Sequence, residues 1–472
     1  MPAALVVGGS VAGLAAALAL AGTGRQVVVL ERSAPPPRGA MCDLHNRWQR
    51  PTVPQAQHSH TLTSLGVRTL RKRAPEVLER LVASGAPLFD LTRALPQGAT
   101  DRAREVGDDD LVALGCRRTT LEMVLYRAVA ALPQVDIRHG TTVRGLRLGP
   151  DGRAVRGVVT TDGAHLAADV VVDATGRRAA ARGWLTEAGI PVEADETSPS
   201  GLRGFSRFYR LRSGSLPGPL NRGHAAGDIW DHYAGVLHPA DAGTFSIALG
   251  TLPGDPALAG LRDPDAFTAA ARATPGLTEW LDESVSAPHS AVHVITSPAN
   301  SLRATALRPP VAGLFPVGDA ACVTDPLFGR GMSLALAQAF GLADVLAARP
   351  AEQWRDAAAD FAETLLRPWY EHAADADRER IARWNAMVYR RPLSPAAAPG
   401  QAMRAAAAYD GTVWRGLTRV LMGLATPDEV FGDEKFRHRV AQAPQGAVAT
   451  GAAPPPRDEL VRAVAAAEGK RP

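Results

Sequence analysis

The first residues whose types and spacing could do chemistry form a glycine-rich turn near the N-terminus. Gly8, Ser10 and Gly13 stand where a dinucleotide-binding turn has the pattern Gly-x-Gly-x-x-Gly. Gly8 allows a tight turn, Gly13 lets the helix pack closely on the strand, and Ser10 is small enough for a pyrophosphate to reach the helix N-terminus. Glu31 ends the next apolar segment, with Arg32 beside it, and its carboxylate could accept two ribose hydroxyls. The turn therefore predicts a dinucleotide site, and Glu31 disfavours a 2′-phosphate there.

A second glycine-bearing loop lies far downstream of the first. The apolar segment Val311–Val317 ends at Gly318 and Asp319, and Gly329 and Gly331 follow. An NAD-dependent dehydrogenase has no need of such a second loop. A long cofactor that binds in an extended form does need one, because its far half must be held by a different part of the chain. The pair of loops therefore favours FAD over NAD.

These motifs resemble those of the flavoprotein monooxygenases of the para-hydroxybenzoate hydroxylase type, over roughly residues 3–345. The three matching motifs are Gly8–Gly13, Asp173–Arg177 and Gly318-Asp319. The segment Val53–His60 is also similar to a segment of the flavin epoxidases of polyether biosynthesis, and Arg118–Glu122 looks like the arginine-led helix start of the family. The resemblance implies FAD as the cofactor.

The resemblance also implies how the two ends of FAD would be held. Arg118 is expected near the ribityl chain or the phosphates, Asp319 is expected to bind ribityl hydroxyls, and the backbone of Val143 is expected to lie against adenine. The segment Pro326–Met332 is expected to face the isoalloxazine ring.

Elementary physics agrees with this placement of the ring. Gly329 and Gly331 permit a close approach of the backbone, and a helix that begins near Met332 would direct its positive end at the flavin. That dipole stabilises the anion that forms when the flavin is reduced.

The chemistry implied by the resemblance is carried by the cofactor. The flavin is reduced, captures oxygen at C4a as a hydroperoxide, and transfers one oxygen atom to an electron-rich carbon. We expect hydroxylation or epoxidation of a small, largely apolar substrate, in secondary metabolism. The electron donor is expected to be NAD(P)H, although delivery of reduced flavin by a separate reductase is also compatible with the sequence. Cys322 stands where many aromatic hydroxylases carry His, which loosens any assignment to phenol hydroxylation.

His58 and His60 are the best polar candidates for catalysis, as residues that line the cavity. They would share a face on a strand, whereas only one could face the flavin on a helix. The alternative is that both are structural histidines that hold the loop by hydrogen bonds. We expect no metal site, because nearby partner ligands are missing.

Aromatic residues are sparse in this chain and gather in its second third. Phe208, Trp230 and Tyr233 are our candidates for contact with the substrate, although a sheet core would use the same residue types and is expected to hold most of them. Arg177 and Arg178 could meet the phosphates of NAD(P)H, or could be surface arginines.

The elements that would position these residues predict an α/β (α+β) fold class. A strand at Ala3–Val7, a helix and a strand at Val27–Leu30 make a βαβ start, and an arginine-led helix begins near Thr119. We expect a discontinuous Rossmann-like FAD-binding domain over residues 1–185 and 296–345, with a mostly antiparallel β substrate domain inserted at 186–295. A helical C-terminal region is expected at 346–440, and a disordered Ala/Pro/Gly-rich tail at 441–472.

Composition narrows the function classes. The chain has 472 residues, 46% hydrophobic and 21% charged, with a net charge of only +4 and scattered basic residues, which disfavours nucleic acid as a partner. Cys42, Cys116 and Cys322 are too few and too far apart for a disulfide framework, so a cytoplasmic setting is expected. The apolar run at 11–21 is too short to span a membrane. The acidic run Asp108–Asp110 is expected to be solvated.

Four other functions compete with this interpretation. A flavin halogenase is disfavoured, because the family element Trp-x-Trp-x-Ile-Pro is missing from the sequence. A flavin-dependent reductase or desaturase of a prenyl-type substrate stays open, as does a flavin-bound protein that is not an oxygenase. An NAD-dependent dehydrogenase is the remaining enzyme alternative.

Overall fold

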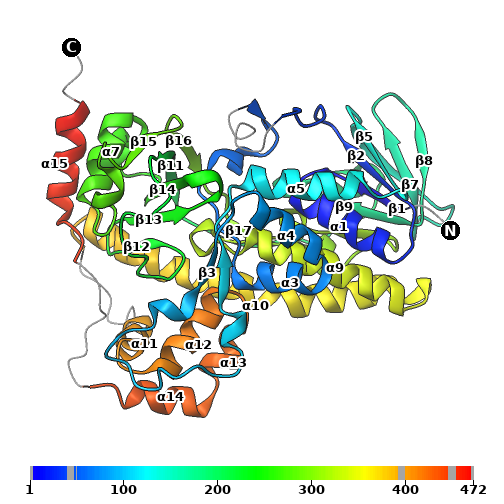
Figure 1. The fold of residues 1–472 in the computed structure, drawn as a ribbon. Helices are drawn as coiled ribbons and strands as arrows, with labels where there is room; N and C mark the ends of the chain where they lie inside the picture. Colours follow the sequence, from blue (N-terminus) through cyan, green and yellow to red (C-terminus); the bar gives the residue numbers. More distant parts are fainter. Residues whose placement is uncertain (1–3, 40–46, 49, 392–398, 445–452, 469–472) are drawn as a thin grey trace.

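A parallel sheet forms the centre of one half of the molecule in the computed structural model, which describes residues 4–39, 47, 48, 50–391, 399–444 and 453–468 (Figure 1). Cys42 lies outside the described residues. The five strands have the order β18-β9-β1-β2-β5, and every neighbouring pair is parallel. The strands are β1 (Ala4–Val7), β2 (Val27–Glu31), β5 (Val135–His139), β9 (Val170–Asp173) and β18 (Leu314–Pro316). Their nearly continuous apolar residues fit a sheet that is covered on both faces.

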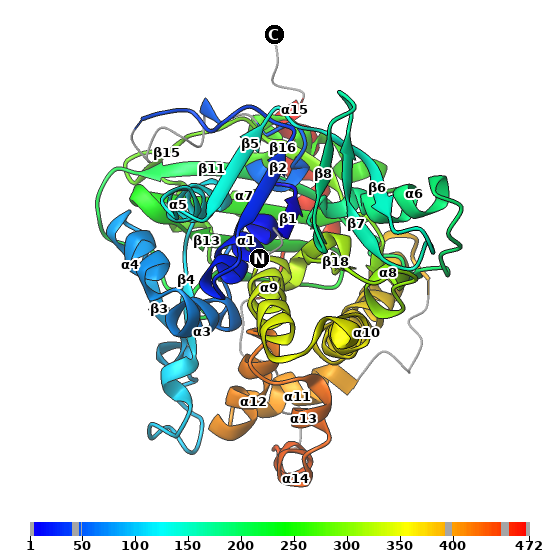
Figure 2. The same ribbon diagram turned by 90° about the vertical axis from the view of Figure 1, so that its right-hand side faces the viewer.

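Helices cover one face of this sheet and a small antiparallel sheet covers the other (Figure 2). The helical layer consists of α1 (Val11–Gly22), α3 (Ser64–Arg73), α4 (Pro75–Ala83), α5 (Arg118–Ala130) and α9 (Gly331–Ala348). The opposite layer consists of β6 (Val143–Leu148), β7 (Val155–Thr160), β8 (His165–Ala167) and α6 (Ala180–Glu187). Alternate residues of β1 point to the two layers, since Val6 packs with the helices and Leu5 packs with the small sheet.

Among the described residues one helix, α9, is long and apolar enough by composition to cross a membrane. It packs against α1, α3 and the long helix α10 (Trp354–Val388). Within its apolar stretch 61% of the residues are buried inside the protein, which is the environment of a core helix.

A six-stranded antiparallel sheet forms the other half of the molecule. Its path is β12-β13-β14-β11-β15, and β16 also pairs with β11. The strands are β11 (Arg203–Leu211), β12 (Ala226–Ile229), β13 (Ala234–Pro239), β14 (Thr244–Thr251), β15 (Ser286–Pro288) and β16 (His293–Thr296). One face packs on α7 (Pro264–Ala273) through the buried side chains of Phe205, Tyr209 and Phe245. The other face is turned towards the first half.

Short elements join the two halves. A three-stranded sheet has the order β10-β17-β19, where the strands are Glu196–Ser198, Asn300–Leu302 and Cys322–Val323. Helix α8 (Ala304–Leu307) follows β17 and packs on α10. The predicted fold class, a Rossmann-like α/β core with an inserted antiparallel sheet and a helical C-terminal part, is therefore confirmed.

The last third of the chain adds a separate group of helices, which lies below the antiparallel half in Figure 1. This group consists of α11 (Pro399–Ala407), α12 (Gly411–Leu421), α13 (Pro427–Phe431) and α14 (Glu434–Ala441), and it contacts the hairpin of β3 (Leu88–Asp90) and β4 (Val112–Leu114). The Nε atom of Arg415 lies 2.9 Å from an oxygen of Asp108, and both side chains are buried. The prediction of a solvated acidic run is wrong for Asp108, because an arginine from a remote helix neutralises it.

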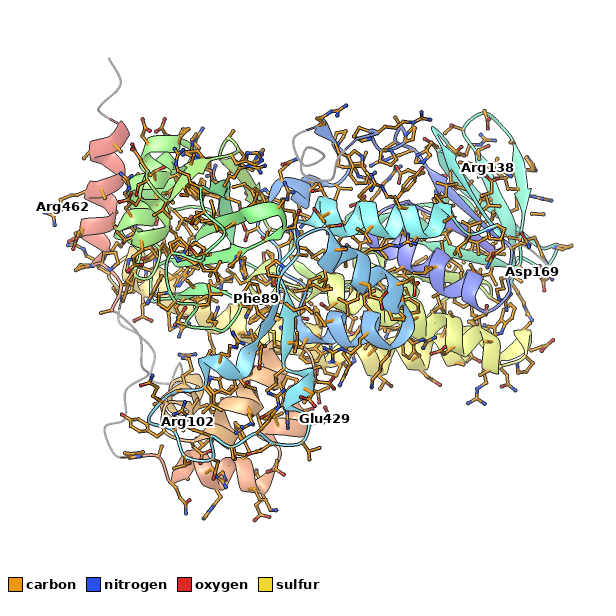
Figure 3. The ribbon with its side chains drawn as sticks, viewed as in Figure 1. Phe89, Arg102, Arg138, Asp169, Glu429 and Arg462 are labelled. Carbon is orange, nitrogen blue, oxygen red and sulfur yellow. The ribbon has the colours of Figure 1, made fainter. Side chains whose placement is uncertain are left out.

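The prediction of a disordered tail at 441–472 is also wrong in part. Residues Arg457–Glu468 form α15, which packs on α7 at the outer end of the antiparallel half. Leu460 and Val464 are buried in the core of that half, while Arg462 projects from the outer side of α15 (Figure 3). Arg457 adds an ion pair of 2.7 Å to the buried Asp255. The apolar residues at i and i+4 supply the buried face that a helix needs.

Candidate functional site

The N-terminal turn brings β1, α1 and β9 into close contact. Gly8 has φ of +111°, and a Cβ atom on it would lie 2.4 Å from the carbonyl oxygen of Ala174. A Cβ atom on Gly13 would lie 1.8 Å from the carbonyl oxygen of Gly8. Gly8 lines the large cavity that starts here, whereas Gly13 does not. The small size of Gly13 therefore serves the packing of the helix on the strand, which is the role that the sequence predicts for it.

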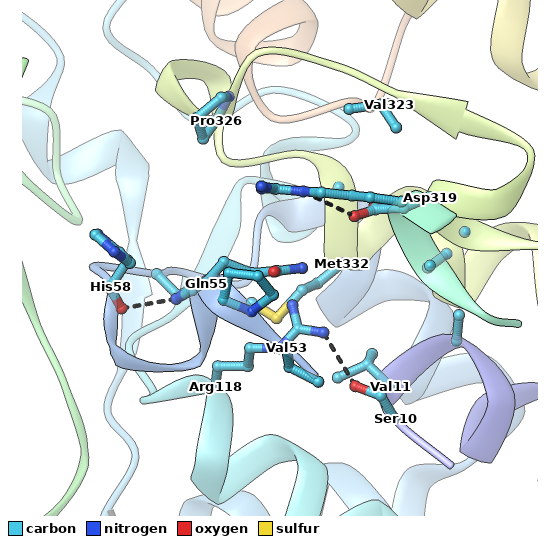
Figure 4. A pocket seen from close by; sticks show the side chains of 18 of the residues that line it. Ser10, Val11, Val53, Gln55, His58, Arg118, Asp319, Val323, Pro326 and Met332 are labelled. Atoms are coloured by element: carbon cyan, nitrogen blue, oxygen red, sulfur yellow. Dashed lines mark hydrogen bonds and ion pairs between the residues drawn. The ribbon is translucent and has the colours of Figure 1, made fainter. Parts of the chain in front are cut away.

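Ser10 links the turn to two charged residues of α5. Its hydroxyl donates to Glu122 Oε2 at 3.1 Å and accepts a hydrogen bond from Arg118 at 3.1 Å (Figure 4). Glu122 is buried and pairs with Arg50 at 2.5 Å. Ser10 precedes α1 without capping it through its side chain, so the first amides of the helix stay available. Free amides and a cation at one helix start form a site for an anion such as a pyrophosphate.

Glu31 closes the far end of the same site. Its two carboxylate oxygens accept from the backbone amides of Gly9, at 2.6 Å, and Ser33, at 2.7 Å. Burial acts to raise the pKa of Glu31, but these amides and the charge of Arg50 together hold it below its ordinary value. Glu31, Arg32 and Val143 all line the cavity. An ionised acceptor at this place can bind the hydroxyls of a ribose.

The second loop lies directly on the first. Gly318 begins the short 3-10 helix Gly318–Ala320, and its amide donates to Gln338 Oε1 at 2.9 Å. Gln338 also donates to the carbonyl oxygen of Pro316 at 3.1 Å, so one side chain of α9 fixes both sides of the turn. Asp319 lines the cavity, and its Oδ2 lies 3.6 Å from Arg177 Nε (Figure 4). Sequence reasoning missed Gln338, since a glutamine in an apolar helix carries no distinct signal.

The segment that follows forms one wall of the cavity. Pro326, Gly329, Gly331 and Met332 all line it, and α9 begins at Gly331 without a side-chain cap. The side chain of Asp325 caps the turn Pro326–Phe328 and so fixes this segment.

Asp325 itself belongs to a buried charge cluster. It pairs with Arg380 at 3.0 Å, and Arg380 also pairs with Asp377 at 2.8 Å. Burial and the neighbouring carboxyl of Asp377 raise the pKa of Asp325 well above its ordinary range. The cluster ties the cavity wall to α10.

One continuous cavity of about 470 Å³ joins all these parts. It runs from Gly8 and Glu31, past Arg118 and Asp319, to the face of the antiparallel sheet that α7 leaves free. Two helix starts, those of α1 and α9, open onto it without side-chain caps. These free amides, the nearby arginines and an ionised acceptor at one end fit the phosphates, ring and ribose of an extended adenine-flavin dinucleotide.

His58 and His60 lie in the loop after the 3-10 helix Pro54–Gln57, and both line the cavity. They also hold that loop, since His58 Nδ1 lies 3.1 Å from Ser206 Oγ and His60 Nδ1 lies 2.8 Å from the carbonyl oxygen of His58. Burial, with the charge of His293, lowers the pKa of His58 to about 4, and burial with the charge of Arg118 lowers that of His60 to about 3. Both rings are therefore neutral near pH 7.

Several residues of the inner end of the cavity were missed by sequence reasoning. They come from the free face of the antiparallel sheet, from the loop before β12 and from the end of α12. The set includes Gly204, Ser206, Arg222, His224, Ala234, Val236, His238, Ala248, Gly250, Leu421 and Met422. We call this end the inner chamber. The alternation of small or polar residues with core residues along β13 and β14 is the signal that could have found it.

The candidate substrate contacts Phe208, Trp230 and Tyr233 do not line the cavity. Tyr233 is buried in the core between the sheet and α7, where Trp230 stacks on it at 5.1 Å between ring centroids. Phe208 is buried as well. None of the three therefore lines the cavity, and Trp230 and Tyr233 instead pack in the sheet core, which is the alternative that the sequence left open.

Arg177 lines the cavity beside Asp319 and so is not a plain surface arginine; Arg178 lines it too. Within the described part of the chain, no group of three or more His, Cys, Asp or Glu residues could hold a metal ion.

Comparisons with known proteins agree with this architecture. Protein Rv3254 of Mycobacterium tuberculosis (strain ATCC 25618 / H37Rv) is 29% identical over 415 residues, which is 81% of this chain and 82% of that protein. The crystal structure of PqsL, a probable FAD-dependent monooxygenase from Pseudomonas aeruginosa, matches 82% of this chain and 99% of its own with a TM-score of 0.59 and 17% identity. The flavin-dependent brominase Bmp2 matches 93% of this chain and 98% of its own, with a TM-score of 0.61 and 16% identity. No protein-family profile matches the sequence. The chain therefore has the fold of FAD-dependent monooxygenases and halogenases, as the resemblance implied.

Proposed function

We propose that this protein is an FAD-dependent monooxygenase of secondary metabolism that hydroxylates or epoxidises a small, largely apolar, electron-rich substrate. NAD(P)H is the proposed electron donor: one atom of O₂ enters the substrate, and the other leaves as water with the two electrons that the donor supplies. The observation that carries the proposal is the single cavity that joins the N-terminal turn, the Asp319 loop and the inner chamber. A cofactor that spans the first two would place its reactive end beside the third.

The residues that would hold FAD come from six places in the fold. The free amides of α1 and the guanidinium of Arg118 would bind the phosphates, Glu31 would bind the adenosine ribose, and Val143 would contact adenine. Asp319 would bind ribityl hydroxyls, and the segment Pro326–Met332 would lie against the ring. Bound there, the flavin supplies the redox and oxygen-activating chemistry.

The protein's own contribution to the reaction is to orient the substrate and exclude water. The inner chamber is lined by the antiparallel sheet and by Leu421 and Met422 at the end of α12. His58 and His60, neutral and fixed by hydrogen bonds, would stand between ring and chamber. The proposed role of the C-terminal helices is therefore to close the inner chamber.

The test begins with the purified protein. We expect visible flavin absorption, release of FAD on denaturation, and loss of the flavin bands when NADH or NADPH is added without oxygen. With isotopically labelled O₂ and a substrate, one labelled atom should appear in the product. If only a separately reduced flavin supports turnover, a partner reductase is the donor.

The same measurement separates the competing functions. A product without labelled oxygen, formed as NAD(P)H is consumed, would indicate a reductase or desaturase of a prenyl-type substrate. Bound FAD with no oxygen uptake in response to any substrate would indicate a flavin protein that is not an oxygenase. A halogenated product in the presence of chloride or bromide would overturn the monooxygenase proposal.

A further inference from the structure

His224 presents a fixed hydrogen-bond acceptor to the inner chamber. Its Nδ1 lies 3.1 Å from the carbonyl oxygen of Arg222, which can only accept, so Nδ1 carries the hydrogen. Burial, with the charge of Arg222, lowers the pKa of His224 to about 4, so the ring is neutral at pH 7 and Nε2 holds a lone pair. Among the described residues Nε2 has no hydrogen-bond partner, and the ring lines the cavity.

His238 lies beside His224, and its Nε2 can act either as a hydrogen-bond acceptor or as a donor. The two ring centroids are 5.7 Å apart, with planes at 40°. His238 Nδ1 lies 3.1 Å from Ser59 Oγ, and Ser59 Oγ lies 2.8 Å from Ser246 Oγ. The Ser59 hydroxyl has one hydrogen, so it donates either to Ser246 or to His238, and Nε2 of His238 is an acceptor or a donor accordingly.

The charges of the cavity wall restrict what these rings can bind. The carboxylates that line the cavity within the described residues are Glu31 and Asp319, both at the cofactor end. The inner chamber therefore offers no carboxylate to balance the charge of an ammonium group. Its one arginine, Arg222, lies 3.6 Å from Asp228 and is partly neutralised. Val236, Ala248 and Met422 give the chamber an apolar part of its wall.

We propose that His224 and His238 together bind a hydroxyl group of the substrate, which donates to Nε2 of His224 and accepts from Nε2 of His238. The substrate class is then a neutral alcohol or phenol on an apolar skeleton, neither a carboxylate nor an amine. This inference rests on the proposed function, since it places the substrate in the inner chamber. It makes both histidines positioning residues for that substrate.

The experiment titrates the FAD-loaded protein with four related probes by calorimetry. The probes are 2-naphthol, 2-methoxynaphthalene, decahydro-2-naphthol and 2-naphthoate. We expect 2-naphthol to bind roughly fivefold to tenfold more tightly than its methyl ether, because the ether cannot donate to His224. The saturated alcohol distinguishes a phenol site from an alcohol site. Equal binding of naphthol and ether, tighter binding of naphthoate, or no binding of naphthol would each overturn the assignment.

Two variants of His224 sharpen the result. H224L should remove the preference for naphthol over ether, whereas H224Q should keep most of it, because the glutamine carbonyl can accept in place of Nε2. The matched control is H232L, since His232 lies just before β13 and is similarly buried but does not line the cavity. Retention of the preference in H224L, or its loss in H232L, contradicts the proposal.

The flavin spectrum keeps this test separate from that of the proposed function. A protein that does not bind FAD defeats the proposed function before any probe is added. A protein that binds FAD but does not distinguish the probes defeats only the hydroxyl site.

Discussion

Gly318 lies directly against Ala12: a Cβ atom on Gly318 would be 2.7 Å from the Cβ of Ala12. This contact joins the Asp319 loop to the first turn of α1, although the two are remote in sequence. Because of this contact the two glycine-bearing turns line one groove, and the proposed binding of FAD depends on that groove.

The variant G318A tests this contact. Gly318 has φ of +61°, so alanine is strained there and also collides with Ala12. We expect FAD to bind about tenfold more weakly or worse, measured as the flavin retained after dialysis. The matched control is G183A in α6, where a Cβ atom meets nothing within 4 Å. That variant should keep its flavin and unfold at the same or a slightly higher temperature. Full flavin retention in G318A would argue against the groove.

The variant S10G tests whether the departure from the glycine pattern has a purpose. It restores the usual pattern of the turn but removes the hydroxyl that joins Arg118 to Glu122. Hydrogen bonds to charged groups contribute about 1.5–3 kcal/mol, so we expect FAD binding to weaken by about tenfold or more. S10A should behave in the same way. Binding of FAD by S10G as tight as in the natural protein would show that Arg118 needs no support from Ser10.

The buried pair of Arg415 and Asp108 tests how the C-terminal helices are attached. R415M leaves the Asp108 carboxylate buried without its partner, so we expect a loss of about 3 kcal/mol in the free energy of unfolding, measured with urea. The double variant R415M/D108L should recover a good part of that loss, because no unpaired charge is left. Additive losses in the double variant would mean that the two residues act independently.

The neutral histidines of the cavity predict a loss of stability in acid. His58 and His224 have their pKa lowered to about 4 in the folded state, against an ordinary value of 6.5. Between these values the unfolded chain binds protons that the folded chain does not, so the free energy of unfolding falls as pH is lowered from 6.5 to 4. Each histidine contributes at most about 1.4 kcal/mol per pH unit.

The variant H224Q isolates one of these contributions. The buried carboxyls of Asp173 and Asp325 have raised pKa values, so they stabilise the folded protein as the pH is lowered, opposite to the histidines. The pH dependence of the free energy of unfolding is therefore compared between H224Q and the natural protein. Urea unfolding at pH 7 and pH 5 should show a smaller loss for H224Q than for the natural protein. An equal loss in both would mean that His224 is protonated in the folded state.

The cofactor end of the site was predictable from sequence because its signals are local. Gly8, Ser10 and Glu31 lie within one βαβ unit, and Asp319 directly follows an apolar strand. The inner chamber was not predictable, because His224 lies just before β12 and meets His238 of β13 only through the register in which these two strands pair. A one-residue shift in that register would turn His238 into the core.

Two other misses have the same physical origin. Asp108 is buried against Arg415, which lies in a helix far along the chain. No local sequence pattern predicts such a partner. The α15 helix follows an Ala/Pro/Gly-rich stretch whose composition dominates the sequence pattern, yet Leu460 and Val464 find an apolar surface on α7. Tertiary partners decided both outcomes.

Titration of the flavin-free protein with FAD, FMN and ADP tests the central claim most directly, because only FAD can reach the N-terminal turn and the Asp319 loop at once. We predict that FAD binds at least about 100-fold more tightly than either fragment, as linked ligands do when both sites are engaged. The G8V variant should weaken FAD and ADP but leave FMN unchanged. Equal affinity for FAD and FMN, or no measurable affinity for FAD, would contradict the account.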